Sequence, residues 1–255
     1  MDIQLAMTMW RFQDIFGRLK KCIRWGGYKE RHYEQSSLEH SFAIALLTAF
    51  CVMKEKELKG PAENFDPFRM VVHALVHDFC EGAIGDITYR FKNDPRLLYL
   101  VKLIEKEEGL RSTRHISFIG PFLAEAIILE PGSLEEKFFD AMERLDYFFY
   151  ALAEYEIHKH LDFVAVFDRQ HAKLVEYASV FPSVAMIYSQ EVQEYVEKEM
   201  KTNWGLIGLG GELRPHKPCQ KDVEDLEEAL KQLLAQLAKQ REASGEKGGT
   251  DASTV

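Results

Sequence analysis

The stretch of the chain that carries the most chemistry covers residues 71–86, VVHALVHDFCEGAIGD. It sets His77, Asp78, Glu81 and Asp86 into an apolar background that is typical of a buried helix. Adjacent His and Asp side chains in such a background need hydrogen-bond partners or a metal ion, because burying an unpaired charge is costly. Residues three or four apart share a helix face, so Glu81 is expected over both His77 and Asp78. The stretch therefore predicts a metal site at the end of a helix, with Glu81 and Asp86 nearby.

Further metal-ligand candidates lie on both sides of this stretch. His40 stands in the first turn of an apolar segment, and Asp140 and Asp146 stand on one long helical segment. These two carboxylates are six residues apart, so they cannot both face one ion. Apolar neighbours favour Asp146, and Asp140 and Glu143 remain alternatives. Two histidines and two carboxylates suit a divalent metal such as Mn, Co, Fe or Zn, with positions left for water and substrate.

These motifs together resemble the HD phosphohydrolase superfamily. The run HDFCEGAIGD at 77–86, with EHS at 39–41 and RW at 24–25, is similar to the branch that contains the bacterial 5'-deoxynucleotidases. The resemblance covers roughly residues 10–200. It departs from the family pattern at residues 26–27, where two glycines replace an expected proline.

The resemblance implies an all-α HD-domain bundle and metal-dependent removal of the 5'-phosphate from deoxyribonucleoside 5'-monophosphates. The metal ligands carried over from the family are His40, His77, Asp78 and Asp146. The acid and base residues carried over are Glu81 and Asp86. The substrate-binding residues carried over are Arg24 for the phosphate, Trp25 as a sugar-side wall that excludes a 2'-hydroxyl, and Lys92 as a second phosphate contact.

Two other functions fit the same residues. The site could hydrolyse a nucleoside triphosphate or another phosphate ester, with extra cations at its mouth supplied by Arg90, Lys92 and Arg96. Alternatively, the chain could be a nucleotide-binding regulator with an idle metal site. The intact pair Glu81 and Asp86 argues against that second alternative.

Composition narrows the class of partner. The 255 residues are 46% hydrophobic and 29% charged, which fits a globular protein with a full core. A net charge of −9 disfavours a nucleic-acid polymer as partner, because such binding depends on basic surfaces. Four scattered cysteines without a CxxC pair indicate reduced thiols, and the N-terminus does not resemble a secretory signal. We therefore expect a cytoplasmic protein that binds a nucleotide and does not span a membrane.

Helical periodicity runs through the first 200 residues. A capping box at Ser36 and Glu39 opens the segment 37–55, whose inner face is expected to hold His40, Ala43, Leu46 and Leu47. The predicted helices cover residues 6–22, 37–55, 67–82, 96–109, 119–129, 133–158, 163–181 and 184–201.

The C-terminal part of the chain has a different composition. We predict an HD domain over 1–202, a Gly/Pro-rich linker over 203–220, an amphipathic helix over 221–242 and a disordered tail over 243–255. The helix has apolar residues spaced three and four apart, Val223, Leu226, Leu230, Leu233 and Leu237. This short heptad seam suits self-association into a homodimer or higher homo-oligomer, and equally suits docking onto the chain's own domain.

Overall fold

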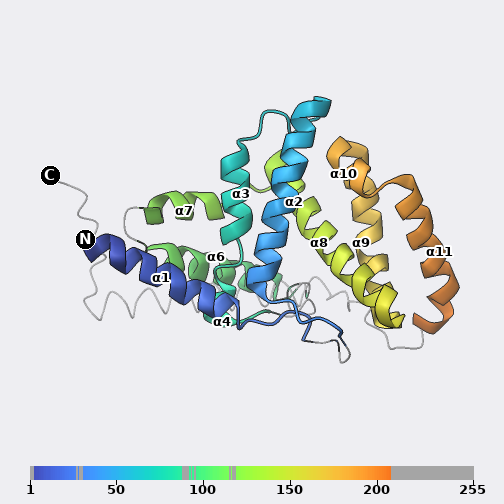
Figure 1. The fold of residues 1–255 in the computed structure, drawn as a ribbon, viewed down its shortest axis with the longest axis horizontal. Coiled ribbons are helices and arrows are strands. Elements are labelled where there is room, and N and C mark those ends of the chain that lie inside the picture. Colours follow the sequence, from blue (N-terminus) through green and yellow to red (C-terminus); the bar gives the residue numbers. More distant parts are fainter. Residues whose placement is uncertain are drawn as a thin grey trace.

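The structure is a computed structural model that describes residues 3–207, apart from residues 27, 29–30, 88–91, 93, 95, 115 and 117–118. Over these residues the fold is all-α, as predicted (Figure 1). Its helices are α1 (Ile3–Leu19), α2 (Ser37–Leu58), α3 (Pro67–Val76), α4 (Glu81–Ile84), α6 (Leu98–Arg114), α7 (Gly120–Ile127), α8 (Leu134–His158), α9 (Leu161–Val180), α10 (Pro182–Ile187) and α11 (Gln190–Ile207). α11 extends past residue 202, and the helix predicted over 221–242 lies outside the described residues.

Helices α2 and α3 occupy the centre of the molecule (Figure 1). On one side they pack with α8, α9 and α10 around the larger apolar core, which includes Ile44, Met70 and Phe138. On the other side α3 and the end of α1 meet α7 around a smaller core that includes Leu19 and Leu123. Helix α3 therefore contributes to both cores, and α2 reaches the smaller one through Leu38, which packs against it.

Two predicted helices are divided in the structure. The segment 67–82 is not one helix: α3 ends at Val76, and α4 begins at Glu81. Between them the amide of Phe79 donates to the Val76 carbonyl and that of Glu81 to the Asp78 carbonyl, so the hydrogen bonds span three residues rather than four. The segment 184–201 is likewise divided, into α10 and α11.

The prediction that Leu46 lies on the inner face of α2 is wrong, because Leu46 is 58% exposed. The buried side of α2 is instead lined by His40, Ile44, Thr48 and Val52. Because α2 is apolar around most of its circumference, its hydrophobic period does not reveal which side faces the core. The capping box at its start is present as predicted, with Ser36 and Glu39 satisfying each other's backbone N–H groups.

Among the described helices, α2 alone has the length and composition that would suffice to cross a membrane. The core helix of a globular protein passes the same test, and 44% of this apolar stretch is buried inside the bundle. The buried carboxylate of Glu55 near its C-terminal end accepts hydrogen bonds from the backbone N–H and the hydroxyl of Ser183 on α10, at 2.8 and 2.6 Å. This contact fastens α10 to α2.

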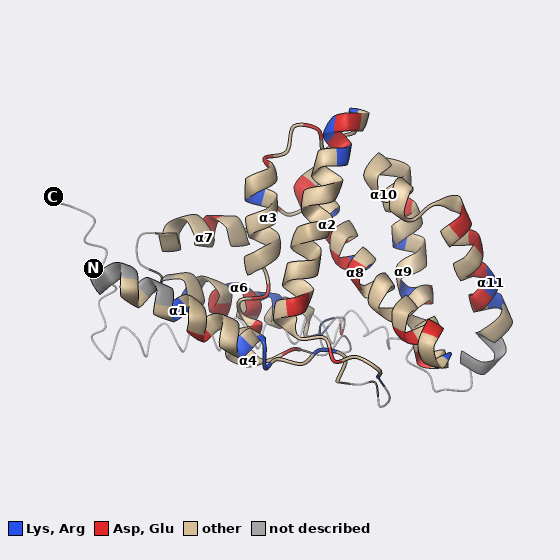
Figure 2. Cartoon of the chain, viewed as in Figure 1, with Lys and Arg blue, Asp and Glu red and all other residues tan. Residues whose placement is uncertain are grey.

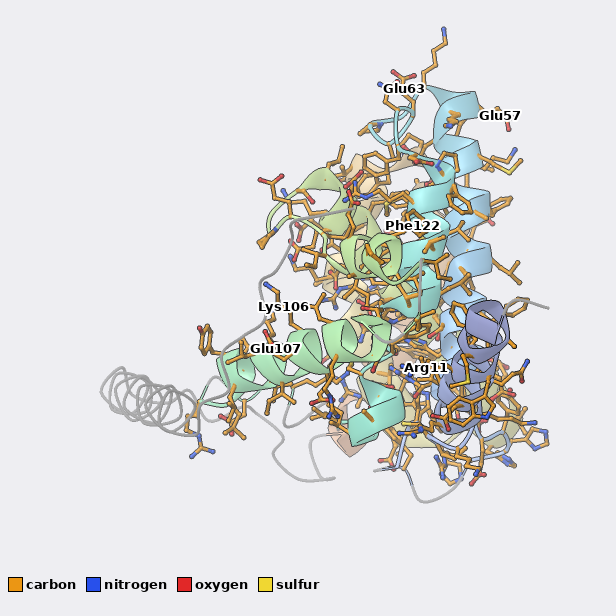
Figure 3. The ribbon with its side chains drawn as sticks, turned by 90° about the vertical axis from the view of Figure 1, so that its left-hand side faces the viewer. Arg11, Glu57, Glu63, Lys106, Glu107 and Phe122 are labelled. Atoms are coloured by element: carbon orange, nitrogen blue, oxygen red, sulfur yellow. The ribbon has the colours of Figure 1, made fainter. Side chains whose placement is uncertain are left out.

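We predict that Glu55→Ala destabilises the fold by about 2–3 kcal/mol, because it leaves the buried Ser183 N–H without an acceptor. The matched control is Glu57→Ala, two residues away on the same helix, where the side chain is 63% exposed and projects from the end of α2 (Figure 3). That change should alter the free energy of unfolding by no more than about 0.5 kcal/mol. Urea unfolding measures both, and equal effects would show that the Glu55 contact does not stabilise the fold.

Candidate metal and phosphate site

The candidate site lies where α2 begins, α3 ends and the middle of α8 passes (Figure 1). His40 is in the first turn of α2, held by the capping box. His77 and Asp78 follow the last residue of α3, and Asp146 lies on α8. The four ligand candidates from the sequence therefore come from three elements that meet at this end of the bundle.

Two histidine nitrogens converge on one carboxylate. Nε2 of His77 lies 3.2 Å and Nε2 of His40 lies 3.7 Å from Oδ2 of Asp78. Both Nε2 atoms are buried and have no hydrogen-bond partner. Buried polar atoms are nearly always paired, so two unpaired nitrogens beside a carboxylate suit the binding of a cation. Ligand atoms of all three residues lie within 4.8 Å of one another, a spacing that suits a divalent metal ion.

The other ring nitrogens fix the orientation of these imidazoles. Nδ1 of His77 lies 2.8 Å from the carbonyl of Ala74, and Nδ1 of His40 lies 2.6 Å from Oδ2 of Asp146. An Nδ1–H that donates to these oxygens leaves the Nε2 lone pair available for a metal ion. The structure therefore places Asp146 directly beside His40, but outside the group of His40, His77 and Asp78 whose ligand atoms converge.

The rival carboxylates of α8 are placed differently. Asp140 accepts hydrogen bonds from Nε of Arg144 at 2.7 Å and from the hydroxyl of Tyr177 at 2.5 Å, on the side of α8 that faces α9. Glu143 is partly exposed, and its Oε1 lies 3.8 Å from Nε2 of His77. Asp146 and Glu143 thus share the face of α8 that borders the site, whereas Asp140 faces α9.

The pKa values of the two histidines beside Asp78 are shifted in opposite directions. Burial, with the neighbouring Arg24, lowers the pKa of His40 to about 4, so its imidazole is neutral. Burial also disfavours the charged form of His77, but the Asp78 carboxylate outweighs it and raises the pKa of His77 to about 9. His73, one turn before His77, is held by the Ala126 carbonyl at 2.7 Å and lies edge-on to Phe139, so it is a buried contact of α7 and α8.

Glu81 holds two cations beside the metal site. Its Oε2 accepts from Nη1 of Arg24 at 3.3 Å and from the Ser37 hydroxyl at 2.5 Å, and its Oε1 accepts from Lys92 at 3.1 Å. Burial raises the pKa of Glu81, and the charge of Asp78 adds to this effect, although Arg24 and Lys92 oppose it. Lys92 also pairs with Glu105 on α6 at 3.1 Å.

Arg24 reaches the site from the segment between α1 and α2. This segment is fixed by an antiparallel bridge between Ile23 and Ser36. Nη1 of Arg24 lies 2.9 Å from Oδ2 of Asp78, and Nη2 donates to the Tyr147 hydroxyl at 3.2 Å. The guanidinium is buried, and its Nε has no partner, so a phosphate oxygen could accept from this group.

Trp25 is held in a strained backbone conformation, with φ at +63°. A bulky residue rarely adopts this left-handed region, and such strain is common at functional sites. The indole stacks on Tyr150 with ring centroids 4.7 Å apart, and its N–H donates to Oε1 of Gln35 at 2.9 Å. The Nε2 of Gln35 in turn donates to Oδ2 of Asp146 at 3.1 Å. Trp25 is therefore linked to the metal site through one amide side chain.

Three residues of the site were not singled out from the sequence. Gln35 bridges Trp25 to Asp146, and Ser37 binds Glu81. Tyr147 stacks against His40, with the two rings 5° from parallel and 5.5 Å apart. Gln35 and Ser37 flank Ser36, the first residue of the recognisable capping box, and Tyr147 directly follows Asp146, so adjacency to motif residues was the available signal.

The remaining sequence candidates lie at different distances from this cluster. The backbone of Asp86 lies beside the Cys22 thiol, and its carboxylate is near enough to Arg24 to raise that residue's pKa. Within the described residues the Asp86 carboxylate has no hydrogen bond. Arg96 is paired with Asp94 at 2.7 Å, and Arg90 lies outside the described residues.

The fold is that of the HD-domain class. The solved structure of an HD-domain phosphohydrolase from Listeria innocua is similar to this chain, with a TM-score of 0.61 at 18% sequence identity, covering 80% of this chain and 99% of that one. A conserved hypothetical protein from Pyrococcus furiosus has a TM-score of 0.50 at 20% identity, covering 74% of this chain and 99% of that one.

The sequence identifies the family more closely. Residues 11–195 match the family described as "5'-deoxynucleotidase YfbR-like", and the chain belongs to this family. The resemblance found in the motifs is thereby confirmed, and the chain is a metal-dependent phosphohydrolase of the HD class. A search of curated proteins finds no match.

We predict that Asp146→Ala loses bound metal and activity, whereas Asp140→Ala keeps both. Removing Asp146 takes away a carboxylate that contacts His40, and loss of a ligand or of its supporting partner typically weakens metal binding about 10–100-fold or more. Asp140→Ala breaks only contacts to Arg144 and Tyr177, at a cost of about 1 kcal/mol of stability. Elemental analysis of both purified variants decides the matter. Full metal occupancy in Asp146→Ala would transfer the role to Asp140 or Glu143.

Metal binding should also depend on pH through His77. Because its pKa is about 9 in the metal-free site, His77 is protonated at pH 7, and the ion must displace that proton. The apparent affinity should therefore rise about tenfold per pH unit from pH 7 and level off above pH 9. Calorimetric titration with Mn²⁺ in buffers of different ionisation enthalpy counts the proton. An affinity that does not change between pH 7 and 9 would contradict the prediction.

Proposed function

We propose that this protein removes the 5'-phosphate from deoxyribonucleoside 5'-monophosphates. The observation that carries the proposal is the adjacency of two groups: unpaired histidine nitrogens around Asp78, and the cations Arg24 and Lys92 gathered on Glu81. The first group suits a divalent ion, and the second suits a phosphate dianion. The family name, 5'-deoxynucleotidase YfbR-like, supports this substrate class.

His40, His77 and Asp78 would hold the ion, and Asp146, the fourth ligand expected from the sequence, would act from the far side of the His40 ring, where it contacts Nδ1. A divalent metal bound there would lower the pKa of a bound water and polarise the phosphoryl group. Mn, Co, Fe and Zn all accept such a mixture of imidazole and carboxylate ligands. His40 meets the requirement for a neutral imidazole without losing a proton, because its pKa is about 4.

The two cations would change partners when substrate binds. In the described contacts Arg24 and Lys92 are both directed at Glu81. A phosphate with two negative charges competes for them, and its arrival would leave Glu81 less stabilised as a carboxylate. The pKa of Glu81, already raised by burial, would then rise further. This places Glu81 well to hold a proton for the leaving 5'-oxygen.

Asp86 is the better candidate for receiving the proton of the attacking water. Its carboxylate has no hydrogen bond within the described residues, whereas that of Glu81 is engaged by three donors. A general base needs an available lone pair within reach of the water that it deprotonates. The two carboxylates would then divide the acid and base steps of one hydrolysis.

Trp25 would form the wall beside the sugar. Its indole is fixed by Tyr150 and Gln35, so it would not move aside for an extra hydroxyl group. Rigid exclusion of the 2'-hydroxyl would favour deoxyribose. The link from Gln35 to Asp146 would connect this wall to the metal ligands.

Two alternatives have less support. For triphosphate hydrolysis, extra cations were expected at the mouth from Arg90, Lys92 and Arg96. Of the two that lie among the described residues, Lys92 pairs with Glu81 and Glu105, and Arg96 is bound to Asp94. For a regulator with an idle site, a buried Glu81 that gathers two cations would serve no purpose. We also propose a cytoplasmic location, which the free thiols of Cys22, Cys51 and Cys80 support.

Phosphate release from a panel of substrates tests the proposal. We expect hydrolysis of dAMP, dGMP, dCMP or dTMP, slower hydrolysis of the matching ribonucleotides, and little release from dNTPs. Chelation should abolish phosphate release, because the histidine nitrogens and the Asp78 carboxylate would lose their metal ion. Addition of Mn²⁺ or Co²⁺ should restore the release. Hydrolysis that survives chelation, or that is faster for triphosphates, would overturn the proposal.

The sugar preference has its own control. Trp25→Ala should reduce the ratio of kcat/KM for dAMP over AMP at least about tenfold, because the wall is removed. Trp10→Ala on α1, where the side chain is exposed, should leave that ratio unchanged. An unchanged ratio in Trp25→Ala would remove the tryptophan from the proposed substrate contacts while leaving the metal-dependent reaction in place.

A further inference from the structure

Tyr147 contacts three residues to which the proposed function gives different tasks. Its ring lies 5° from parallel with that of His40, with the centroids 5.5 Å apart, and the Trp25 indole meets it edge-on at 5.9 Å. Its hydroxyl accepts a hydrogen bond from Nη2 of Arg24 at 3.2 Å. One side chain therefore touches a candidate metal ligand, the candidate wall beside the sugar and the candidate phosphate-binding cation.

The place of Tyr147 on α8 accounts for these contacts. Residues three or four apart share a helix face, and Glu143, Tyr147 and Tyr150 follow that spacing. Oε1 of Glu143 lies 3.8 Å from Nε2 of His77, and Tyr150 stacks on Trp25. Tyr147 is thus in the middle of the face that α8 turns toward the site.

The hydroxyl of Tyr147 has a proton that no described residue accepts. A phenol oxygen can accept one hydrogen bond and donate another, and here the contact with Arg24 uses only its acceptor side. A phenol keeps its proton at neutral pH. The partly buried hydroxyl is therefore an available donor directly beside a guanidinium group, and a cation with a neighbouring neutral donor suits an anion.

The guanidinium of Arg24 leaves one edge available on the side of this hydroxyl. Nη1 is the atom that contacts Asp78 and Glu81, at 2.9 and 3.3 Å. Nη2 and Nε form another edge of the planar group, and Nε has no partner. Two N–H groups on one edge can bind two oxygens of a phosphate side by side. A phosphate on this edge would lie within reach of the Tyr147 hydroxyl, because that oxygen is 3.2 Å from Nη2.

The rest of the wall that α8 contributes is poor in donors for a phosphate. Seven residues of α8 are Asp or Glu and two are Lys or Arg (Figure 2). Glu143 and Asp146 border the site, and ionised carboxylates accept hydrogen bonds and repel a phosphate dianion. Tyr150 donates its proton to the carbonyl of Tyr33. Among these described residues of α8, Tyr147 is the one with a donor available for substrate.

We propose that Tyr147 is a substrate-binding residue whose hydroxyl donates a hydrogen bond to the substrate phosphate beside Arg24. This inference rests on the proposed function, because it assumes that a phosphate ester enters this site. The packing of the ring against His40 and Trp25 holds the hydroxyl in position before substrate arrives. A contact made equally in the bound substrate and in the transition state strengthens substrate binding and leaves kcat unchanged.

Binding of inorganic phosphate to the full-length, Mn²⁺-loaded protein tests the contact directly. Tyr147→Phe removes the hydroxyl and keeps the ring, so the metal content should stay the same. We expect calorimetry to show a Kd for phosphate that rises about tenfold or more, because a hydrogen bond to a charged group is lost. The KM for dAMP should rise by a similar factor, with kcat changed by less than about twofold.

The matched control is Tyr155→Phe, eight residues further along α8. The hydroxyl of Tyr155 donates to Glu199 of α11, and its ring packs in the core beside Phe167. Removal of this hydroxyl should leave the Kd for phosphate and the KM for dAMP unchanged.

A double variant separates a direct contact from an effect that passes through Arg24. Arg24→Lys keeps a positive charge and loses the planar fork. If the hydroxyl donates to phosphate, adding Tyr147→Phe to this variant should still raise the Kd for phosphate, at least about fivefold. If the added change has no effect, the hydroxyl acts only by orienting Arg24, and the proposal is overturned.

Two further results would contradict the contact. One is a Kd for phosphate that is the same in the wild type and in Tyr147→Phe, or a wild type that binds no phosphate. The other is a loss of bound metal in Tyr147→Phe, which would make the residue a support of His40 alone. Phosphate binding does not depend on which ester is hydrolysed. A wild type that binds phosphate through Tyr147 and does not hydrolyse dAMP would therefore refute the proposed substrate and leave this contact in place.

Discussion

The structure depends on how it compensates the buried charge of Asp78. This carboxylate lies within 3.7 Å of two histidine nitrogens and 2.9 Å from the Arg24 guanidinium. A buried carboxylate without such partners would be too costly to keep. Each partner comes from a different part of the chain, so satisfying one charge brings together the start of α2, the end of α3 and the segment before α2. The contacts that compensate Asp78 therefore also hold these parts of the bundle together.

A second layer of buried polar contacts holds the first in place. The carboxylate of Glu154 on α8 accepts the backbone N–H groups of His32 and Tyr33 at 2.7 and 2.8 Å. This fixes the segment that carries Arg24 and Trp25 against α8. Gln35 then connects Trp25 to Asp146. Removing one member of such a network leaves its buried partners unsatisfied, so these residues act as a unit.

The exposed side of the bundle and the site are connected through α2 and α3. His40 lies in the first turn of α2 and His77 directly follows α3, and both helices carry exposed apolar side chains along the side turned away from the core. A helix whose two faces are both apolar gains stability from being covered on both.

The sequence by itself determined the all-α fold class and the family, and it predicted three residues of the candidate metal site. Capping residues and periodicity depend on neighbours three or four positions away, so Ser36 and Glu39 mark the start of α2 without any tertiary information. The spacing of His40, His77 and Asp78 matched a motif whose chemistry is known, and these three residues converge in space. Where local signals were weaker, as at the break between α3 and α4, the sequence misplaced the boundary.

Only the tertiary structure decided which polar groups meet and which apolar face stays open. Gln35 and Asp146 are separated by 111 positions, and Arg24 and Tyr147 by 123, so no periodicity links them. Leu46 has the same apolar character as its buried neighbours, and only the packing of α3, α8 and α10 around α2 shows that it faces outward. A contact between distant residues depends on how whole helices cross, and that crossing is set by the combined shape of the core rather than by any single stretch of sequence.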